Sequence, residues 1–141
     1  MLNNLYQKDF NLWVEEIKHK IQNLDLENMD WDNLIDEIDD MGKSEKRSLE
    51  SYLERLIEYI LKLKYWESKR ERNGKHWQAE IVSFRNRIKR LLKRSPSLKR
   101  YLEDIYEEVF QDAVASRRIE FDIPNNSFIE LEKVLREDYS S

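Results

Sequence analysis

The 141-residue chain contains no cysteine and only two glycines and two prolines. Without cysteine, disulfides and thiolate-bound metal sites are excluded. Two glycines cannot build the loops of P-loop or Rossmann proteins, and a β-rich fold would need more turn residues. No apolar run approaches the roughly 18 residues that span a membrane, and the start, MLNNLYQKDF, lacks the pattern of a secretory signal. We therefore expect a cytoplasmic protein with a single helical domain over residues 1–141.

Apolar residues recur along most of the chain at helical spacing, which predicts an all-α fold. We expect a compact bundle of five to six helices with a long central third helix, because the apolar stripe of that helix is wide enough to contact several others. The predicted helices cover residues 9–23, 32–41, 45–69, 75–94 and 96–118, with a short helix opening near residue 127.

Several residues mark the expected helix ends. Asp9, Ser44 and Ser95 are predicted N-caps, because a short side-chain oxygen accepts from free backbone N–H groups of a first turn. Pro96 suits the first helical position, and Gly42 suits the left-handed residue that ends a helix. Ser127 and Glu130 have the spacing of a capping box.

The stretch YWESKRERNGKHW, residues 65–77, has no aliphatic residue and contains an Asn-Gly pair. An Asn-Gly pair is typical of turns, so we predict that this stretch is chiefly the turn between the third and fourth helices. Tyr65, Trp66 and Trp77 are expected to pack together and fix that turn.

Charge is strongly segregated along the chain. Residues 1–61 carry 7 basic and 15 acidic side chains, residues 62–100 carry 14 and 3, and residues 101–141 carry 4 and 11. The central basic block is either a footprint for a partner or is neutralised by the acidic blocks in the fold.

The basic block gives one candidate binding surface. Six cations are expected on the outer side of the fourth helix, where they can follow a phosphate backbone, and two tryptophans can offer stacking surfaces for bases. Against this, the sequence pI is about 5.4, whereas nucleic-acid-binding domains are usually basic, and the acidic fifth helix is expected to flank the cations. The candidate residues are Arg85, Arg87, Lys89, Arg90, Lys93, Arg94, Trp66 and Trp77.

An acidic run gives a second candidate site. Asp32, Asp36 and Asp39 or Asp40 lie about one helical turn apart on one face, and carboxylate oxygens are the ligands that Mg²⁺ prefers. The candidate ligands are Asp36, Glu37 and Asp40. All-α nucleotide pyrophosphohydrolases hold Mg²⁺ with similar helical patterns, so a Mg²⁺-dependent phosphohydrolase is one alternative. A solvated acidic face produces the same string of residues, and we assign no metal, cofactor or catalytic residue on this pattern.

Four segments together resemble a known family: LYQKDFNLW, LIDEIDDMGKSEKRSLESYLERLI, KHWQAEIVSFRNRI and SPSLKRYLEDIYEEVF. Their order and spacing over residues 5–113 are similar to the bacterial domain-of-unknown-function family numbered twenty-nine, which is common in cyanobacteria. The most distinctive matches include Tyr6, Trp13 and Glu37, whereas Asp36 and Asp40 stand where the family often has glutamates. The resemblance implies an all-α fold and a bacterial, cytoplasmic origin, and it supplies no catalytic residues.

From the sequence we predict a non-catalytic protein-interaction module, whose partner is a second copy or another protein. A nucleic-acid-binding domain and the phosphohydrolase are the alternatives, and no membrane partner is expected. Three features separate these functions. An uncovered basic patch favours nucleic acid, convergent carboxylates favour metal, and an exposed apolar patch of several hundred Å² favours protein association.

Overall fold

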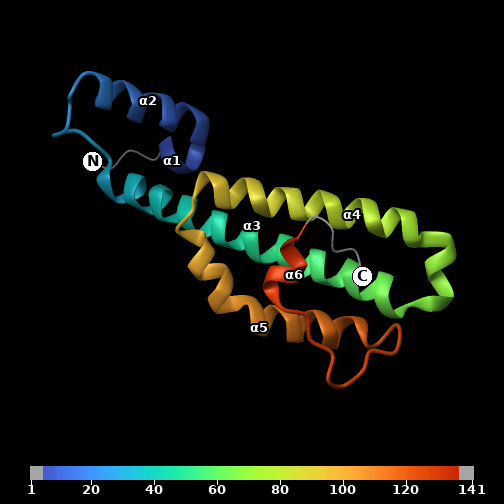
Figure 1. Cartoon of the computed structure of the whole chain (residues 1–141). Coiled ribbons are helices and arrows are strands. Elements are labelled where there is room, and N and C mark those ends of the chain that lie inside the picture. The colour runs from blue at the N-terminus through green and yellow to red at the C-terminus, as the bar shows by residue number, and fades with distance from the viewer. Residues whose placement is uncertain (1–4, 137–141) are drawn as a thin grey trace. The chain divides into compact units, whose positions relative to one another are not determined.

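The computed structural model describes residues 5–136. This part of the chain is all-α, with a long central helix that packs against others, as the sequence predicts. Its helices are α1 (Leu5–Lys8), α2 (Phe10–Gln22), α3 (Trp31–Tyr65), α4 (Glu67–Arg94), α5 (Leu98–Arg117) and α6 (Leu131–Leu135) (Figure 1). The chain divides after Lys43 into two compact units, called here the N-terminal unit (residues 5–43) and the C-terminal unit (residues 44–136).

The C-terminal unit is built around the part of α3 that follows Lys43. Helix α4 runs back alongside α3, α5 lies on the other side of α3, and α6 lies near all three (Figure 1). The α3 stripe predicted from the sequence forms the centre of the core, and its leucines and isoleucines are completely buried. Those with no exposed surface are Leu49, Leu53, Leu56, Ile57, Ile60 and Leu61.

The N-terminal unit is a helical hairpin in which α2 packs against the start of α3. Asp9 caps α2 as predicted, because its carboxylate accepts from the Leu12 N–H at 3.0 Å. Trp13 is buried and donates from its indole N–H to Asp30 at 3.0 Å. Hydrogen bonds from Asn33 and then from Trp13 lower the pKa of Asp30.

The predicted helix end at Gly42 is wrong, because α3 continues through it. Gly42 has no positive φ, and Ser44, the expected N-cap of the next helix, is an exposed helical residue. A glycine inside a helix costs only about 1 kcal/mol relative to alanine. That cost does not stop a helix whose following turns are held in a core.

The turn between the third and fourth helices is also shorter than predicted. Trp66 is the only residue between α3 and α4, and the Asn73–Gly74 pair lies inside α4. The Arg70 guanidinium donates to the carbonyls of Leu63 and Lys64, at 2.7 Å each. It thereby satisfies two of the carbonyls that the end of α3 leaves without partners, which permits the abrupt reversal.

Ser95 and Ser127, two predicted N-caps, contact side chains of α3 with their hydroxyls and do not cap a helix. The Ser95 hydroxyl lies 3.1 Å from a Glu45 carboxylate oxygen, and α5 begins three residues later, at Leu98, with Ser97 at the cap position. The Ser127 hydroxyl lies 2.9 Å from the hydroxyl of Tyr65, and α6 begins only at Leu131. Both serines therefore tie distant segments together, which their local sequence does not reveal.

Candidate functional site

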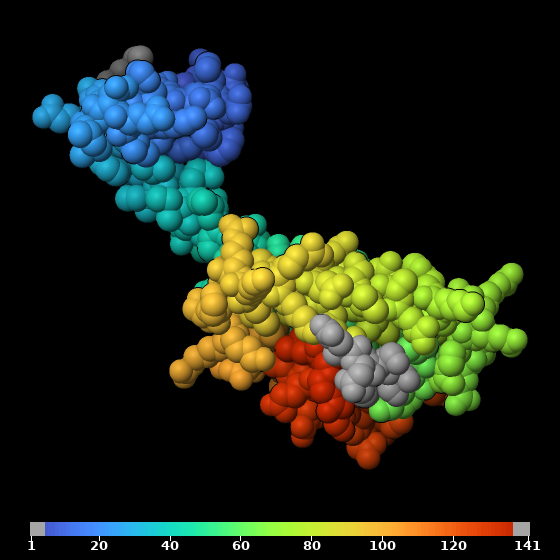
Figure 2. All heavy atoms as spheres, turned by 45° about the horizontal axis from the view of Figure 1, so that its top comes forward, coloured from blue at the N-terminus to red at the C-terminus, as the bar shows by residue number. Residues whose placement is uncertain are grey.

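The basic side of α4 does not have the composition that the sequence predicts, because Arg85 is buried. Its side chain is 2% exposed, and its Nε donates to the carbonyl of Val134 in α6 at 3.0 Å. Figure 2 shows the red C-terminal segment that contains α6 lying against the yellow and yellow-green surface of α4. The expected place of Arg85 on the outer face is therefore wrong, and this cation holds α6 to α4.

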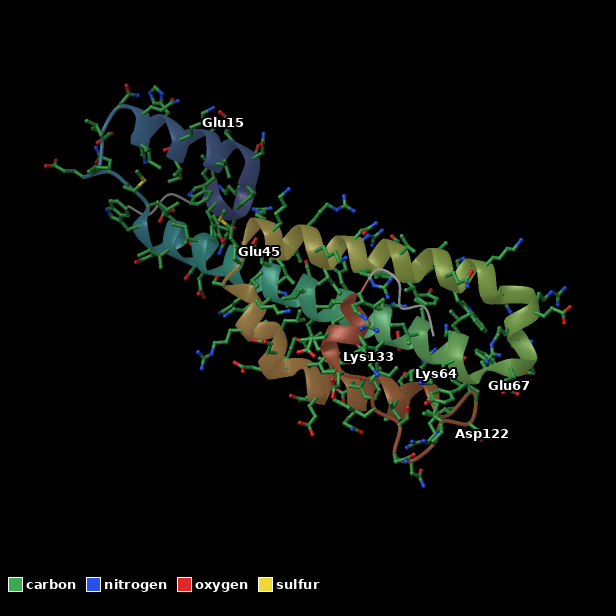
Figure 3. All side chains as sticks on the ribbon, viewed as in Figure 1. Glu15, Glu45, Lys64, Glu67, Asp122 and Lys133 are labelled. Atoms are coloured by element: carbon green, nitrogen blue, oxygen red, sulfur yellow. The ribbon has the colours of Figure 1, made fainter. Side chains whose placement is uncertain are left out.

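The other candidate cations of α4 lie nearer the surface. Arg87, Arg90, Lys93 and Arg94 are exposed, and Lys89 is half-buried. Among the described residues, the four exposed cations form no ion pair with a carboxylate of α5. Arg94 instead lies 3.6 Å from Glu45 of α3, and Figure 3 shows Glu45 on α3 near the connection from α4 to α5.

The two candidate tryptophans pack together, as predicted. Their rings stack with centroids 5.9 Å apart, and Trp66 also stacks on Phe121 at 4.9 Å. Trp77 is only 5% exposed. Its ring belongs to the core next to the α3–α4 turn and offers almost no surface on which a base could stack.

The acidic candidates at the start of α3 have different surroundings. Asp36 and Asp40 are exposed, whereas Glu37 is half-buried and accepts a hydrogen bond from the hydroxyl of Tyr6. That bond, followed by desolvation and by repulsion from nearby carboxylates, raises the pKa of Tyr6 to about 12. Within residues 5–136 no group of three or more His, Asp or Glu side chains has a geometry that could hold a metal ion.

The N-terminal unit carries an exposed apolar surface. In α2, the buried Trp13 and Ile17 mark the side that packs on α3. Phe10, Val14 and Ile21 occupy the adjacent sector of the helix, at 3.6 residues per turn. These three side chains are between 39% and 50% exposed.

Helix α3 repeats this arrangement. Leu34 packs on the small core of the hairpin, and Trp31, Ile35 and Ile38 occupy the sector next to it, with exposed fractions of 48% to 59%. When each helix is viewed along its axis from the N-terminus, the exposed sector lies clockwise of the packed sector. Because the two helices run antiparallel, the two exposed sectors face the same side of the hairpin.

Six residues therefore form one surface, called here the apolar hairpin face. Its two half-exposed aromatic rings alone contribute about 200 Å², and four aliphatic side chains add to this. Monomeric proteins rarely expose larger apolar patches than a few hundred Å². The members are Phe10, Val14, Ile21, Trp31, Ile35 and Ile38.

Gly42 lies on the same sector of α3, four residues after Ile38. A Cβ atom added at Gly42 would meet nothing within 4 Å, and no positive φ requires glycine there. The contacts within the described chain therefore give no reason for this glycine. A small residue on an exposed apolar stripe allows the backbone of another helix to approach closely.

Leu24 is a second unusual residue of the hairpin. It takes the left-handed conformation, with φ of 56°, at the position after the α2 C-cap that glycine usually occupies. Its N–H donates to the carbonyl of Ile21, and the N–H of Asp25 donates to that of Lys20, at 3.1 and 2.8 Å. The Leu24 side chain is nevertheless 78% exposed, so its burial does not offset the backbone strain.

The helical spacing of the apolar residues of the hairpin does not show that part of each stripe is exposed. The sequence does show that the hairpin has more apolar positions than its two helices can bury against each other. Helix α2 and the start of α3 carry apolar stripes wider than the contact between them.

Residues 5–136 are all-α, and their N-terminal hairpin exposes an apolar face. Within residues 5–136 no helix has the length and apolar character needed to cross a membrane. The family model described as "Domain of unknown function DUF29" matches residues 5–140. The chain therefore belongs to this family, as the resemblance of its segments predicts. No curated protein and no solved structure matches it.

Proposed function

We propose that the protein is a non-catalytic interaction module that binds a cationic amphipathic helix of a partner protein on the apolar hairpin face. The observation that carries the proposal is the uncovered face itself, which exposes six large apolar side chains on one side of a two-helix hairpin. Burying apolar surface stabilises a complex by roughly 25 cal/mol per Å², before the entropic costs of association are subtracted.

The geometry of the face supports a helix as its occupant. Two antiparallel helices with apolar residues on the same side offer a surface on which a third helix can pack, as in helix-in-groove recognition. Gly42 leaves open space on this surface. A helix that packs there accounts for a glycine that otherwise weakens α3 by about 1 kcal/mol.

Charge supports a cationic partner over a second copy of the same chain. Residues 1–43 carry 4 basic and 11 acidic side chains, a net charge of −7. Asp32 and Asp39 are exposed and border the Ile35 edge of the face. Two such hairpins would repel each other, whereas lysines and arginines beside the apolar stripe of a partner would be attracted.

The test uses the intact chain and a synthetic peptide with leucines along one helical face and lysines elsewhere. The control peptide has the same composition in scrambled order, without an apolar stripe. We expect the amphipathic peptide to bind with saturation and at least about tenfold more tightly than the scrambled peptide, as measured by fluorescence anisotropy. Equal binding of the two peptides would show general charge attraction and would overturn the proposal.

Matched variants locate the site. Ile35→Ser combined with Ile38→Ser should weaken peptide binding by about tenfold or more, because it removes the centre of the face. Leu12→Ser is the control, because Leu12 is 53% exposed but lies on the opposite side of α2. Gly42→Leu should raise helicity and still weaken binding. If Leu12→Ser weakens binding as much as the double variant, the assigned face is wrong.

The same variants test two other possible occupants of the apolar hairpin face, a second copy of the chain and a membrane surface. Sedimentation of the intact chain would reveal a dimer, and loss of that dimer in the Ile35→Ser, Ile38→Ser variant would assign the face to self-association. Binding to phosphatidylcholine vesicles that is lost in the same variant would assign it to a membrane surface. Either result would overturn the proposal of a partner helix.

A further inference from the structure

A pocket on the C-terminal unit has the chemistry of an anion site. It has a volume of about 320 Å³ and lies between α3 and α4, lined by Tyr52, Arg87, Arg90, Leu91 and Arg94. The three arginines follow one another at intervals of three and four residues, so they stand on one side of α4. The pocket is within the C-terminal unit and involves no residue of the apolar hairpin face.

The arginines of this pocket are poorly neutralised. Among the described residues, no carboxylate lies within ion-pair distance of Arg87 or Arg90. Arg94 has one carboxylate partner, Glu45, at 3.6 Å, and the Arg94 side chain is 77% exposed. Such an exposed pair contributes about 0–1 kcal/mol, so a competing anion can replace it at little cost.

Aromatic rings hold the first of these arginines in place. The Arg87 guanidinium carbon lies 5.0 Å from the ring centroid of Phe84 and 5.7 Å from that of Tyr52. A guanidinium beside ring faces can still use its N–H groups to bind phosphate oxygens in a bidentate manner. Part of the entropic cost of ordering this arginine is therefore met before a ligand arrives.

We propose that this pocket binds the phosphate chain of a small oligophosphate-bearing molecule. Arg87 and Arg94 are seven residues apart, which is about 10 Å along a helix. One phosphate can contact two neighbouring arginines, whereas a chain of phosphates can contact all three. The pocket is shallow and open to solvent, and its volume is near the lower end of the roughly 300–1,000 Å³ of small-molecule sites. Tyr52 also lines the pocket, and a tyrosine hydroxyl can donate a hydrogen bond.

A small ligand suits this site better than a nucleic acid. Of the eight residues expected to bind nucleic acid, Arg85 and Trp77 are buried, and Trp66 is stacked between two rings. The stacking platform that single strands need is therefore absent from the surface of α4 among the described residues. Five cations of α4 remain, and three of them, all arginines, line the pocket.

Isothermal titration of the intact chain with inorganic triphosphate tests the proposal. We expect saturable binding of one triphosphate per chain, weakened about tenfold in Arg90→Gln because a charge-assisted hydrogen bond is lost. Lys93→Gln is the matched control, since Lys93 is an exposed cation of the same helix that does not line the pocket. Equal loss in both variants, or no saturable binding, would overturn the proposal.

Glu45→Gln provides a test with the opposite sign. The change removes the carboxylate that competes for Arg94 but keeps an oxygen that can accept from the Ser95 hydroxyl. Triphosphate affinity should therefore rise several-fold, and an unchanged or lower affinity would contradict the assigned geometry.

Two further titrations identify the source of the phosphates. Adenosine triphosphate that binds more tightly than inorganic triphosphate would assign the ligand to nucleotides, and equal affinities would assign it to the phosphate chain alone. Both outcomes support the site. A DNA duplex that binds more tightly than triphosphate and is released by Arg90→Gln would replace the small ligand with nucleic acid and overturn the proposal.

Discussion

The two units of the chain use the same kind of apolar stripe with different results. Three apolar residues are buried in the core of the N-terminal unit, against twenty-one in that of the C-terminal unit. Of the thirteen large apolar side chains exposed within residues 5–136, ten lie in the N-terminal unit. Helical periodicity therefore predicts which side of a helix is apolar, but the number of elements available to cover that side decides whether it is buried.

Charge separates the units as well. Residues 1–43 have a net charge of −7, whereas residues 44–141, with 21 basic and 18 acidic side chains, have a net charge of +3. A small acidic unit with little core and a large, slightly basic unit with a full core suggest a division of roles. The C-terminal unit folds around its own core, and the N-terminal unit presents apolar surface.

The largest expected effect of a single substitution lies in the core of the C-terminal unit. Leu56 is fully buried in α3, and removing most of a buried leucine side chain costs about 2–5 kcal/mol of unfolding free energy. Leu56→Ala should therefore lower the urea midpoint strongly, as followed by the helical circular dichroism signal.

The matched change in the N-terminal unit is Ile38→Ala, because Ile38 is 59% exposed on the same helix. Its effect on the free energy of unfolding should stay within about 0.5 kcal/mol, as for most surface substitutions. If Ile38→Ala destabilised the chain as much as Leu56→Ala, the contrast between an uncovered face and a core would be wrong.

The elements of the C-terminal unit follow from the sequence because periodicity and burial agree there. The stripe of α3, the seam of α4 and the inner side of α5 all contain the apolar residues that their spacing predicts. The turn at Trp66 does not follow. It depends on Arg70 reaching back to the carbonyls of Leu63 and Lys64, a contact that exists only after the helices have reversed direction.

The candidate sites were less predictable, because they depend on which side of a helix a neighbour covers. Arg85 is part of a basic run in the sequence, yet α6 covers it through the carbonyl of Val134. Trp77 begins an apolar seam and is buried with it. Conversely, Ile35 has the spacing of a core residue but is 59% exposed. Sequence spacing carries no information about these long-range contacts.

An intermediate effect is expected at the strained end of α2. Leu24→Gly should stabilise the hairpin by about 1 kcal/mol, because a left-handed conformation costs a non-glycine residue about 1–3 kcal/mol and glycine is the usual residue at this position. Hydrogen exchange of the α2 amides should slow by about fivefold, while the amides of α5 should be unaffected. Faster exchange in α2 would show that the exposed leucine makes a contact that offsets the strain.

The smallest expected effect concerns Glu54, a half-buried carboxylate on α3. Desolvation first, and then repulsion from Glu58 and Asp112, raises its pKa. A raised pKa in the folded state contributes stability below the pKa of the unfolded state, and that contribution is lost as the pH rises through the folded-state pKa. At neutral pH the ionised Glu54 carboxylate therefore lowers the free energy of unfolding of the C-terminal unit.

Glu54→Gln should consequently raise the free energy of unfolding at neutral pH by roughly half a kcal/mol or less, since solvent screens a partly exposed group. The gain should disappear in buffer below the ordinary carboxyl range, where the wild-type side chain is protonated. Urea unfolding at the two pH values measures this difference, with Glu103→Gln on the exposed side of α5 as the control. A gain of equal size at both pH values would mean that the amide packs better, and that charge repulsion at α3 is not its cause. Such a result would also show that the core of the C-terminal unit, which α3 holds, tolerates an ionised carboxylate at its edge. The C-terminal unit would then differ less from the acidic N-terminal unit.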